Sequence, residues 1–217
     1  MSDMHPAFDS AYPPSPETFA GSLMLDVAIG MDEREDIEER IDELLESDEF
    51  AEVFPGEPEP TAEEARSLLE RVIAEHDRVV AEESADSIAF ANAIGALFDA
   101  GVVASFEGYD AIEAAHDAYA LAEEMRADGA DVRGYVYCHR EDLERVVFTG
   151  RLVIGFSSLS AEPDETARIG RVVLDALVAA GLAAAWSGDP GERILIDPMR
   201  WEGPFEDDDE DVSDSES

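Results

Sequence analysis

The sequence contains no lysine, and its basic residues are few. All 14 of them are arginine, against 54 aspartates and glutamates, so the formal net charge of the 217-residue chain is −40. The acidic stretch at 204–217 contributes only part of this, because the other residues still carry a net −32. Binding to nucleic acid normally requires a basic stripe. The composition therefore predicts that nucleic acid is not a partner.

The large negative charge has a physical consequence for folding. Apolar residues make up 45% of the chain, which is enough for an ordinary core, so the carboxylates are expected on the surface of a folded protein. In dilute buffer such a surface repels itself, whereas in molar salt the screening length falls to about 3 Å. We infer a cytoplasm of multimolar salt, as in an extreme halophile.

Cysteine and long apolar runs are also scarce. The single cysteine, Cys138, excludes an internal disulfide and a thiolate-rich zinc site, and it fits a reducing cytosol. Apolar runs stay well short of the roughly 18 residues that span a bilayer. The first residues lack the basic and apolar regions of a secretory signal. The sequence thus predicts a soluble cytoplasmic protein without a membrane partner.

Several catalytic signatures are missing. The chain has no P-loop, no GxGxxG and no GxSxG, and without lysine it cannot form a Schiff base. His76 and His116 have acidic neighbours, and Glu113 shares a helix face with His116, but no HExxH or second matching pair accompanies them. We expect no metal and no cofactor, and the missing signatures argue against an enzyme.

The first 83 residues divide into an arm and a helical segment. Residues 1–20 hold four prolines and predict a flexible N-terminal arm. In the helical segment, 21–83, apolar residues recur at helical spacing within 31–47 and again within 61–83. Thr61 and Glu64 form a capping box at the start of the second helix. A third helix, 84–101, is expected to turn Ile88, Ala91, Gly95 and Phe98 inward, or alternatively Ile94, Leu97 and Phe98.

The second half predicts a mixed sheet of about five strands. Short apolar runs at 102–106, 133–139, 151–158, 183–187 and 192–197 are typical of strands. Helices are expected at 109–129, 140–148 and 164–180, and on the first of these Ile112 and Tyr119 lie on the predicted apolar side. The class is α+β, in the order β-α-β-β-α-β-β after two or three helices. A ferredoxin-like variant fits it, and an open mixed sheet with helices on both faces is the alternative. The core domain spans 84–203, and 204–217 is predicted to be a disordered acidic tail.

Motifs of the second half carry a resemblance. AIGALFDAGVVA, RGYVYCHREDLERVV and GRVVLDALVAAGLAAAWSGDPGERILI occur in that order. The series resembles a prokaryotic family of uncharacterised proteins, known as a domain of unknown function, and the match is best over residues 94–201. This chain departs from the family pattern at Cys138, where the family has an aromatic residue, and at Ser187, where it has an acid. The resemblance implies a shared layout in a halophile-type variant, and it implies no activity.

A histidine at the end of a strand provides the candidate catalytic site. His139 is followed three residues later by Asp142 in a short helix, so an imidazole, a carboxylate and free backbone N–H groups could meet there. Tyr135 lies on the same strand face as His139. These residues predict an acid–base pair with a tyrosine that orients the substrate, or simply a cap for the helix. Cys138 points to the opposite face from His139 and is expected to be a buried structural residue.

Three large aromatic residues lie at the ends of predicted elements. Tyr109, Trp186 and Trp201 fit the wall of a binding pocket or a partner surface, although core packing would also explain them. The sequence favours a non-catalytic binding or protein-interaction module whose partner is an unknown small molecule or protein. The alternative is a small enzyme that uses His139 and Asp142. Nucleic-acid binding, a third possibility, would need Arg133, Arg140, Arg145 and Arg151 to cluster in space.

Overall fold

The computed structural model describes residues 16–205 except 48, 107, 109 and 161. The chain forms two compact units, one containing the residues up to Glu83 together with those from Glu202 onward, and the other spanning Ser84–Trp201. Most of the predicted N-terminal arm and of the predicted acidic tail lies outside the described residues, as does Tyr109. The two units are described in turn below.

The first unit is helical. Its elements are α1 (Phe19–Ile29), α2 (Arg34–Glu46), α3 (Phe50–Val53) and α4 (Ala62–Val79). The predicted capping box is confirmed, because the Glu64 backbone N–H donates to Thr61 Oγ1 at 3.2 Å and the Thr61 N–H donates to the Glu64 carboxylate at 2.8 Å. These bonds satisfy N–H groups that have no partner within the helix. Helices α2 and α4 correspond to the two helices expected within 31–47 and 61–83, whereas α1 and α3 were not expected from the sequence.

The core of the first unit is built around aromatic contacts. Phe19 lies edge-on to Phe50 and Phe54, with ring centroids 5.3 and 5.5 Å away. The end of the chain returns to this unit, where Phe205 is buried in the same cluster and its N–H donates to Asp77 at 2.8 Å. The helical unit is therefore closed by residues from both ends of the described chain.

The second unit contains the sheet. Its elements are α5 (Ala85–Asp99), β1 (Val102–Ser105), α6 (Ala111–Ala127), β2 (Gly134–Tyr137), α7 (Arg140–Thr149), β3 (Leu152–Ser158), α8 (Pro163–Ala179), β4 (Ala184–Ala185) and β5 (Ile194–Ile196). The strands form one five-stranded sheet in the order β1-β2-β3-β5-β4. Strands β1 and β2 are parallel, and the other neighbouring pairs are antiparallel. The predicted α+β class with a mixed five-stranded sheet is confirmed.

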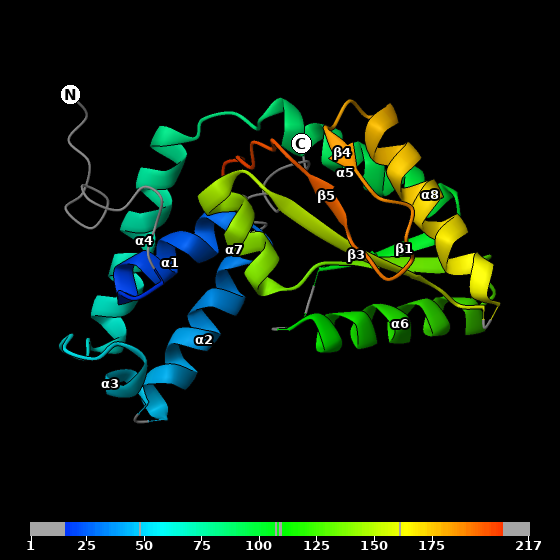
Figure 1. The fold of residues 1–217 in the computed structure, drawn as a ribbon. Coiled ribbons are helices and arrows are strands. Elements are labelled where there is room, and N and C mark those ends of the chain that lie inside the picture. Colours follow the sequence, from blue (N-terminus) through cyan, green and yellow to red (C-terminus); the bar gives the residue numbers. More distant parts are fainter. Residues whose placement is uncertain (1–15, 48, 107, 109, 161, 206–217) are drawn as a thin grey trace, which may run out of the picture. The chain divides into compact units, whose positions relative to one another are not determined.

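The helices lie on both faces of this sheet. Figure 1 shows α5 and α8 along one face and α6 along the other. Strands β1 and β2 are direct neighbours joined by α6, so no strand is inserted between them as in a split βαβ unit. The arrangement matches the open-sheet alternative in this respect. It also places the carboxyl ends of two parallel strands side by side, which is where ligands bind in many sheets of this kind.

Two helices turn a different face inward from the one expected. In α5 the buried residues are Phe90, Ala93 and Leu97, whereas Phe98 is 59% exposed. In α6 the buried residues are alanines, and Ile112 is 82% exposed. Alanine allows α6 to lie close to the sheet, whereas Ile112, Tyr119 and Leu121 on its other faces are exposed.

Candidate functional site

The candidate site lies beyond the carboxyl ends of the parallel strands β1 and β2. The loop after β1 contains Gly108, whose carbonyl accepts the Arg140 N–H at 3.1 Å, so it is tied to the first turn of α7. Gly108 has φ +94°, and a Cβ there would come within 2.6 Å of the Ala114 nitrogen. Only glycine meets both conditions without strain. The backbone at Gly108 is therefore held against α6 and α7.

Asp142 is the centre of the site. It occupies the third position of α7, and its side chain has no exposed surface. Arg193 donates to both carboxylate oxygens, with Nη1 lying 3.3 Å from Oδ1 and Nη2 in closer contact with Oδ2. Arg145 donates to Oδ1 at 2.9 Å. His139 Nε2 lies 3.1 Å from Oδ2. The Asp142 carboxylate is thus surrounded by donors from its own chain.

The backbone completes this arrangement. Asp142 also accepts the His139 N–H at 3.4 Å, which caps the start of α7. A buried carboxylate is stable only when charge and hydrogen bonds compensate for its lost hydration. Two arginines, an imidazole and a backbone amide supply that compensation here. Both carboxylate oxygens of Asp142 are therefore occupied by these donors and are poorly placed to take a proton from a substrate.

Arg193 is itself held on several sides. Its Nη2 donates to the Val153 carbonyl at 3.0 Å, and its guanidinium carbon lies 5.8 Å from the centroid of the Tyr137 ring. Gly155 makes room for that ring, because a Cβ at this position would collide with it. The Nε atom of Arg193 is buried and makes no hydrogen bond among the described residues. The arginine therefore connects α7 with β3 and β5.

His139 is buried at the junction of β2 and α7. The residue is 6% exposed, and its Nδ1 has no hydrogen-bond partner among the described residues. Asp110 lies within electrostatic range of it. The pKa of Asp110 is lowered, chiefly because its carboxylate accepts the backbone N–H groups of Glu113 and Ile112, with a smaller contribution from His139. His139 is thus both the N-cap residue of α7 and a partner of Asp142.

The surroundings of Cys138 favour the protonated thiol. It is completely buried, and burial raises the pKa of the thiol far above its ordinary range. The negative charge of Asp142 raises the pKa further, and Arg193 opposes this effect. Because the thiolate is the nucleophilic form, this environment disfavours nucleophilic chemistry at Cys138. The prediction that Cys138 is buried is confirmed.

Tyr135 lies apart from the cluster around Asp142. Its ring centroid is 6.1 Å from that of Tyr119 and 6.3 Å from that of Tyr137. Burial raises the pKa of its hydroxyl, partly offset by a hydrogen bond with Ser157. Among the described residues, no hydrogen bond or ring contact joins Tyr135 to His139 or Asp142. The tyrosine that reaches the site is Tyr137, two residues later on the same face of β2.

The two tryptophans pack within the second unit. Trp186 Nε1 donates to the carbonyls of Asp189 and Glu192, both at 3.0 Å, and its ring lies edge-on to Phe156. Trp201 lies edge-on to Phe90 at 5.5 Å. Both rings are half-buried. Hydrogen bonds and ring contacts thus hold Trp186 in the terminal hairpin, while Trp201 packs edge-on against Phe90 of α5.

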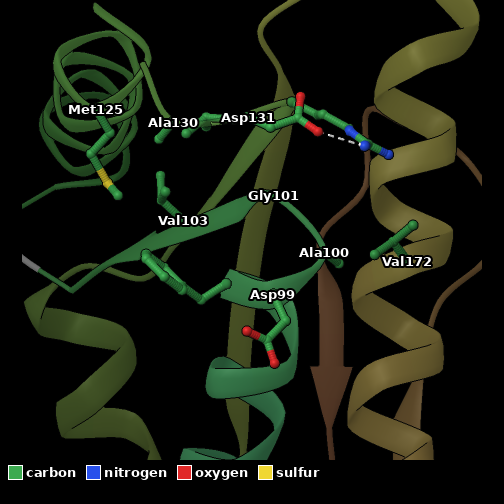
Figure 2. Close-up of a pocket in the computed structure, with 11 residues that line it drawn as sticks. Asp99, Ala100, Gly101, Val103, Met125, Ala130, Asp131 and Val172 are labelled. Carbon is green, nitrogen blue, oxygen red and sulfur yellow. Dashed lines mark hydrogen bonds and ion pairs between the residues drawn. The ribbon is translucent and has the colours of Figure 1, made fainter. Parts of the chain in front are cut away.

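A groove of about 390 Å³ lies at the start of β1, whereas the residues around Asp142 lie beyond the other end of that strand. Figure 2 shows its lining side chains arranged around Gly101, at the start of the strand. The lining residues come from the end of α5, β1, the end of α6, the loop before β2, and α8: Phe98, Asp99, Ala100, Gly101, Val103, Met125, Ala130, Asp131, Val132, Arg133 and Val172. Of the candidate site residues that the structure describes, none of His139, Asp142, Tyr135, Trp186 and Trp201 lines it. Its walls are mostly apolar, with an ion pair between Asp131 and Arg133 at the rim.

The four arginines considered for nucleic-acid binding each lie beside a carboxylate. The pairs are Arg133 with Asp131, Arg140 with Glu144, Arg145 with Asp142, and Arg151 with Asp197.

In the part of the chain that the structure describes, no three His, Cys, Asp or Glu side chains are grouped so that they could hold a metal ion. None of the described helices has the length and apolar character needed to cross a bilayer.

Comparison with protein families gives one match. The family model described as a domain of unknown function (DUF6891) matches residues 15–203. The chain belongs to this family. The DUF6891 match extends well beyond residues 94–201, where the resemblance is best in the sequence, and includes the helices of the first unit. Comparisons with curated proteins and with solved structures give no match.

Proposed function

We propose that this DUF6891 protein is a non-catalytic binding module that holds an apolar group of its partner in the groove at the start of β1. The observation that carries the proposal is the groove itself. It has a size within the usual range for ligand sites, and Phe98, Val103, Met125 and Val172 give it apolar walls.

The contacts of Asp142 support a structural role, and not a catalytic one, for His139 and Asp142. A general base must offer a lone pair to a substrate proton. Both oxygens of Asp142 already accept from Arg193, and Arg145 and His139 take further positions. The alternative, a small enzyme with His139 and Asp142 as the acid–base pair, retains one supporting observation, the unpartnered Nδ1 of His139. We favour the binding module because the carboxylate is already engaged.

The setting we propose is the cytoplasm of a halophile. Support comes from the charge of −40 on a chain that forms two folded units. The ion pairs at Arg133, Arg140, Arg145 and Arg151 reduce the positive charge available for phosphates, so we propose a protein or an apolar small molecule as the partner, without nucleic acid.

A neutral apolar dye tests the groove directly. Nile red carries no charge, so the acidic surface does not repel it, and its emission rises in an apolar site. In molar KCl we expect saturable binding to the full chain. Ala130→Phe, at an exposed lining position, should abolish that binding by filling the groove. Ala120→Phe, at an exposed position on α6 outside the groove, is the matched control and should bind as the unmodified chain does.

Two results would contradict the proposal. If the dye does not bind, the groove does not accept an apolar guest. If the dye binds equally well to the Ala130→Phe and Ala120→Phe variants, it binds elsewhere on the protein. A reaction found for this protein and lost in a correctly folded His139→Ala variant would instead favour the enzyme.

A further inference from the structure

The carboxyl ends of two helices meet at the groove at the start of β1. Phe98, Asp99 and Ala100 come from the end of α5, and Met125 comes from the last turn of α6. The aligned peptide dipoles of a helix place a partial negative charge, about half an elementary charge, at its carboxyl end. Both helices therefore give this groove a negative end.

Asp99 adds a full negative charge at the same place. It is the last residue of α5, whose last turn contains no basic residue. Figure 2 draws the ion pair between Asp131 and Arg133, but no such line reaches the Asp99 carboxylate. This carboxylate makes no hydrogen bond or ion pair with the residues that the structure describes. An acid at the carboxyl end of a helix is unfavourable unless a cation lies beside it.

The arginines near the groove do not supply that cation. Three of them line the groove or adjoin a lining residue in the sequence, and each already has a partner: Arg133 with Asp131, Arg126 with Glu123, and Arg171 with the ring of Trp186. Because the charges of Arg133 and Asp131 cancel, the lining side chains keep a net charge of −1, which is that of Asp99. The apolar walls thus have one uncompensated carboxylate beside them.

We propose that the groove binds a small amphiphilic amine, whose alkyl or aryl group lies against the apolar walls and whose ammonium group faces Asp99. This inference rests on the proposed function and names the chemistry of the ligand of the same groove. The ammonium group supplies the cation that the end of α5 lacks. A volume of about 390 Å³ suits a small organic molecule. An anionic amphiphile brings a like charge to Asp99 and is disfavoured.

Displacement of Nile red compares three guests that share one alkyl chain. Near pH 7 hexylamine is cationic, hexanol is neutral and hexanoate is anionic. In molar KCl we expect hexylamine to displace the dye from the full chain at a concentration about 3- to 5-fold lower than hexanol, since an exposed ion pair and a helix end each contribute modestly. Hexanoate should be weaker than hexanol. Equal displacement by hexylamine and hexanol would overturn the inference.

A neutral substitution at Asp99 assigns the preference to this carboxylate. Asp99→Asn should make hexylamine no better than hexanol and leave displacement by hexanol unchanged. Asp164→Asn is the matched control, because Asp164 is an exposed acid in the first turn of α8 that does not line the groove. The control removes the same charge and should keep the preference for hexylamine. An equal loss of preference in both variants would show that the charge of the whole chain selects the amine, and would overturn the role of Asp99.

Charge reversal gives a result that loss of structure cannot imitate. Asp99→Lys places a cation at the carboxyl end of α5, where it is favourable for the helix. The variant should still bind Nile red but should prefer hexanoate to hexylamine, and an unchanged preference for hexylamine would overturn the inference. Displacement by a short peptide with adjacent leucine and lysine, but not by hexylamine, would make the occupant a segment of a basic protein and overturn the small amine.

The failure of this inference differs from the failure of the proposed function. If Nile red binds in the groove and hexylamine and hexanol displace it equally, the groove stands as an apolar site and only the inference about charge is wrong. If Nile red does not bind to the unmodified chain, the groove proposal fails and this inference fails with it.

Discussion

Arg193 and Asp142 lie 51 positions apart in the sequence and form a two-pronged ion pair at the start of α7. The pair joins the residue just before β5 to a helix that precedes β3. Because Arg193 also donates to the Val153 carbonyl, it links α7, β3 and β5 through one guanidinium group. An arginine is suited to this task since its planar fork matches a carboxylate with two parallel hydrogen bonds.

Replacing Arg193 should destabilise the second unit strongly. Arg193→Met retains much of the apolar stem and removes the charge, so Asp142 remains buried with only Arg145 and His139 as charged or polar side-chain partners. Breaking a buried ion pair by removing one partner costs about 3–5 kcal/mol. We expect a loss near the lower end, about 3 kcal/mol, because Asp142 keeps those two partners. Urea unfolding in molar KCl, followed by circular dichroism, measures the change.

The matched control is Arg133→Met. Arg133 pairs with Asp131, and both side chains are largely exposed, at 66% and 82%. Exposed ion pairs contribute little to stability. The control should therefore unfold at nearly the same urea concentration as the unmodified chain. Equal effects of the two substitutions would show that burial of Asp142 does not make its ion pair special.

The pairing of His139 with Asp142 could be predicted from the sequence, whereas the role of Arg193 could not. The first two residues are three positions apart at a strand-to-helix junction, where local geometry brings a capping residue and the third helical residue together. Arg193 reaches them only because β5 pairs with β3, with Ile194 opposite Ile154. That register depends on the topology of the whole sheet, which no local spacing encodes.

The orientation of α5 and α6 also escaped prediction, for a related reason. Helical periodicity identifies the buried face of a helix only when one face is apolar and the opposite face is polar. The interior of α5 is apolar or small on nearly every side, so Ile88 and Leu97 were equally plausible core residues, and only Leu97 is buried. On α6 the close approach to the sheet favours Ala114 and Ala118, and excludes larger side chains such as Ile112.

Gly108→Ala should destabilise the loop that contacts α7. Gly108 and Gly129 have nearly the same positive φ, +94° and +98°, but only at Gly108 would a Cβ collide with backbone, at the Ala114 nitrogen. Gly129→Ala therefore reports the strain of the left-handed backbone alone, of the order of 1 kcal/mol. We expect Gly108→Ala to cost about 1–3 kcal/mol more, measured by urea unfolding. Similar losses for both variants would mean that the loop moves away from α6 freely.

Cys138 should be unreactive in the folded protein and reactive after unfolding. Burial raises the pKa of its thiol above the ordinary value of 9.0, so the folded state keeps the proton while the unfolded state releases it at high pH. Stability linked to this group is therefore fully present below about pH 9 and declines as the pH rises above it. Native labelling with iodoacetamide near pH 8 should be negligible, and labelling in urea should be complete. Fast labelling of the native chain would contradict the buried placement.

The pH dependence has its own control. Cys138→Ala removes the thiol, and the fall in stability above about pH 9 should become shallower than in the unmodified chain. Some decline should remain, since burial also raises the pKa of Tyr135 and its titration acts in the same direction. An unchanged slope would show that Cys138 loses its proton as easily in the folded state as in the unfolded one.

Salt should stabilise the folded chain over the whole range from dilute buffer to molar KCl. At a net charge of −40 the carboxylates repel one another more strongly in the compact state than in the expanded one. Raising the ionic strength from 0.1 M to 1 M shortens the screening length from about 10 Å to about 3 Å, and so removes most of that repulsion. We expect the midpoint of thermal unfolding to rise steadily with KCl.

Lowering the pH toward 5 in dilute buffer should be a poor substitute for salt, because carboxylates with ordinary pKa values remain mostly ionised there. A chain that is equally stable without salt would contradict the proposed halophilic setting. The ion pair between Arg193 and Asp142 does not decide this, because it is partly buried and therefore weakly screened, and we expect it to persist with or without salt.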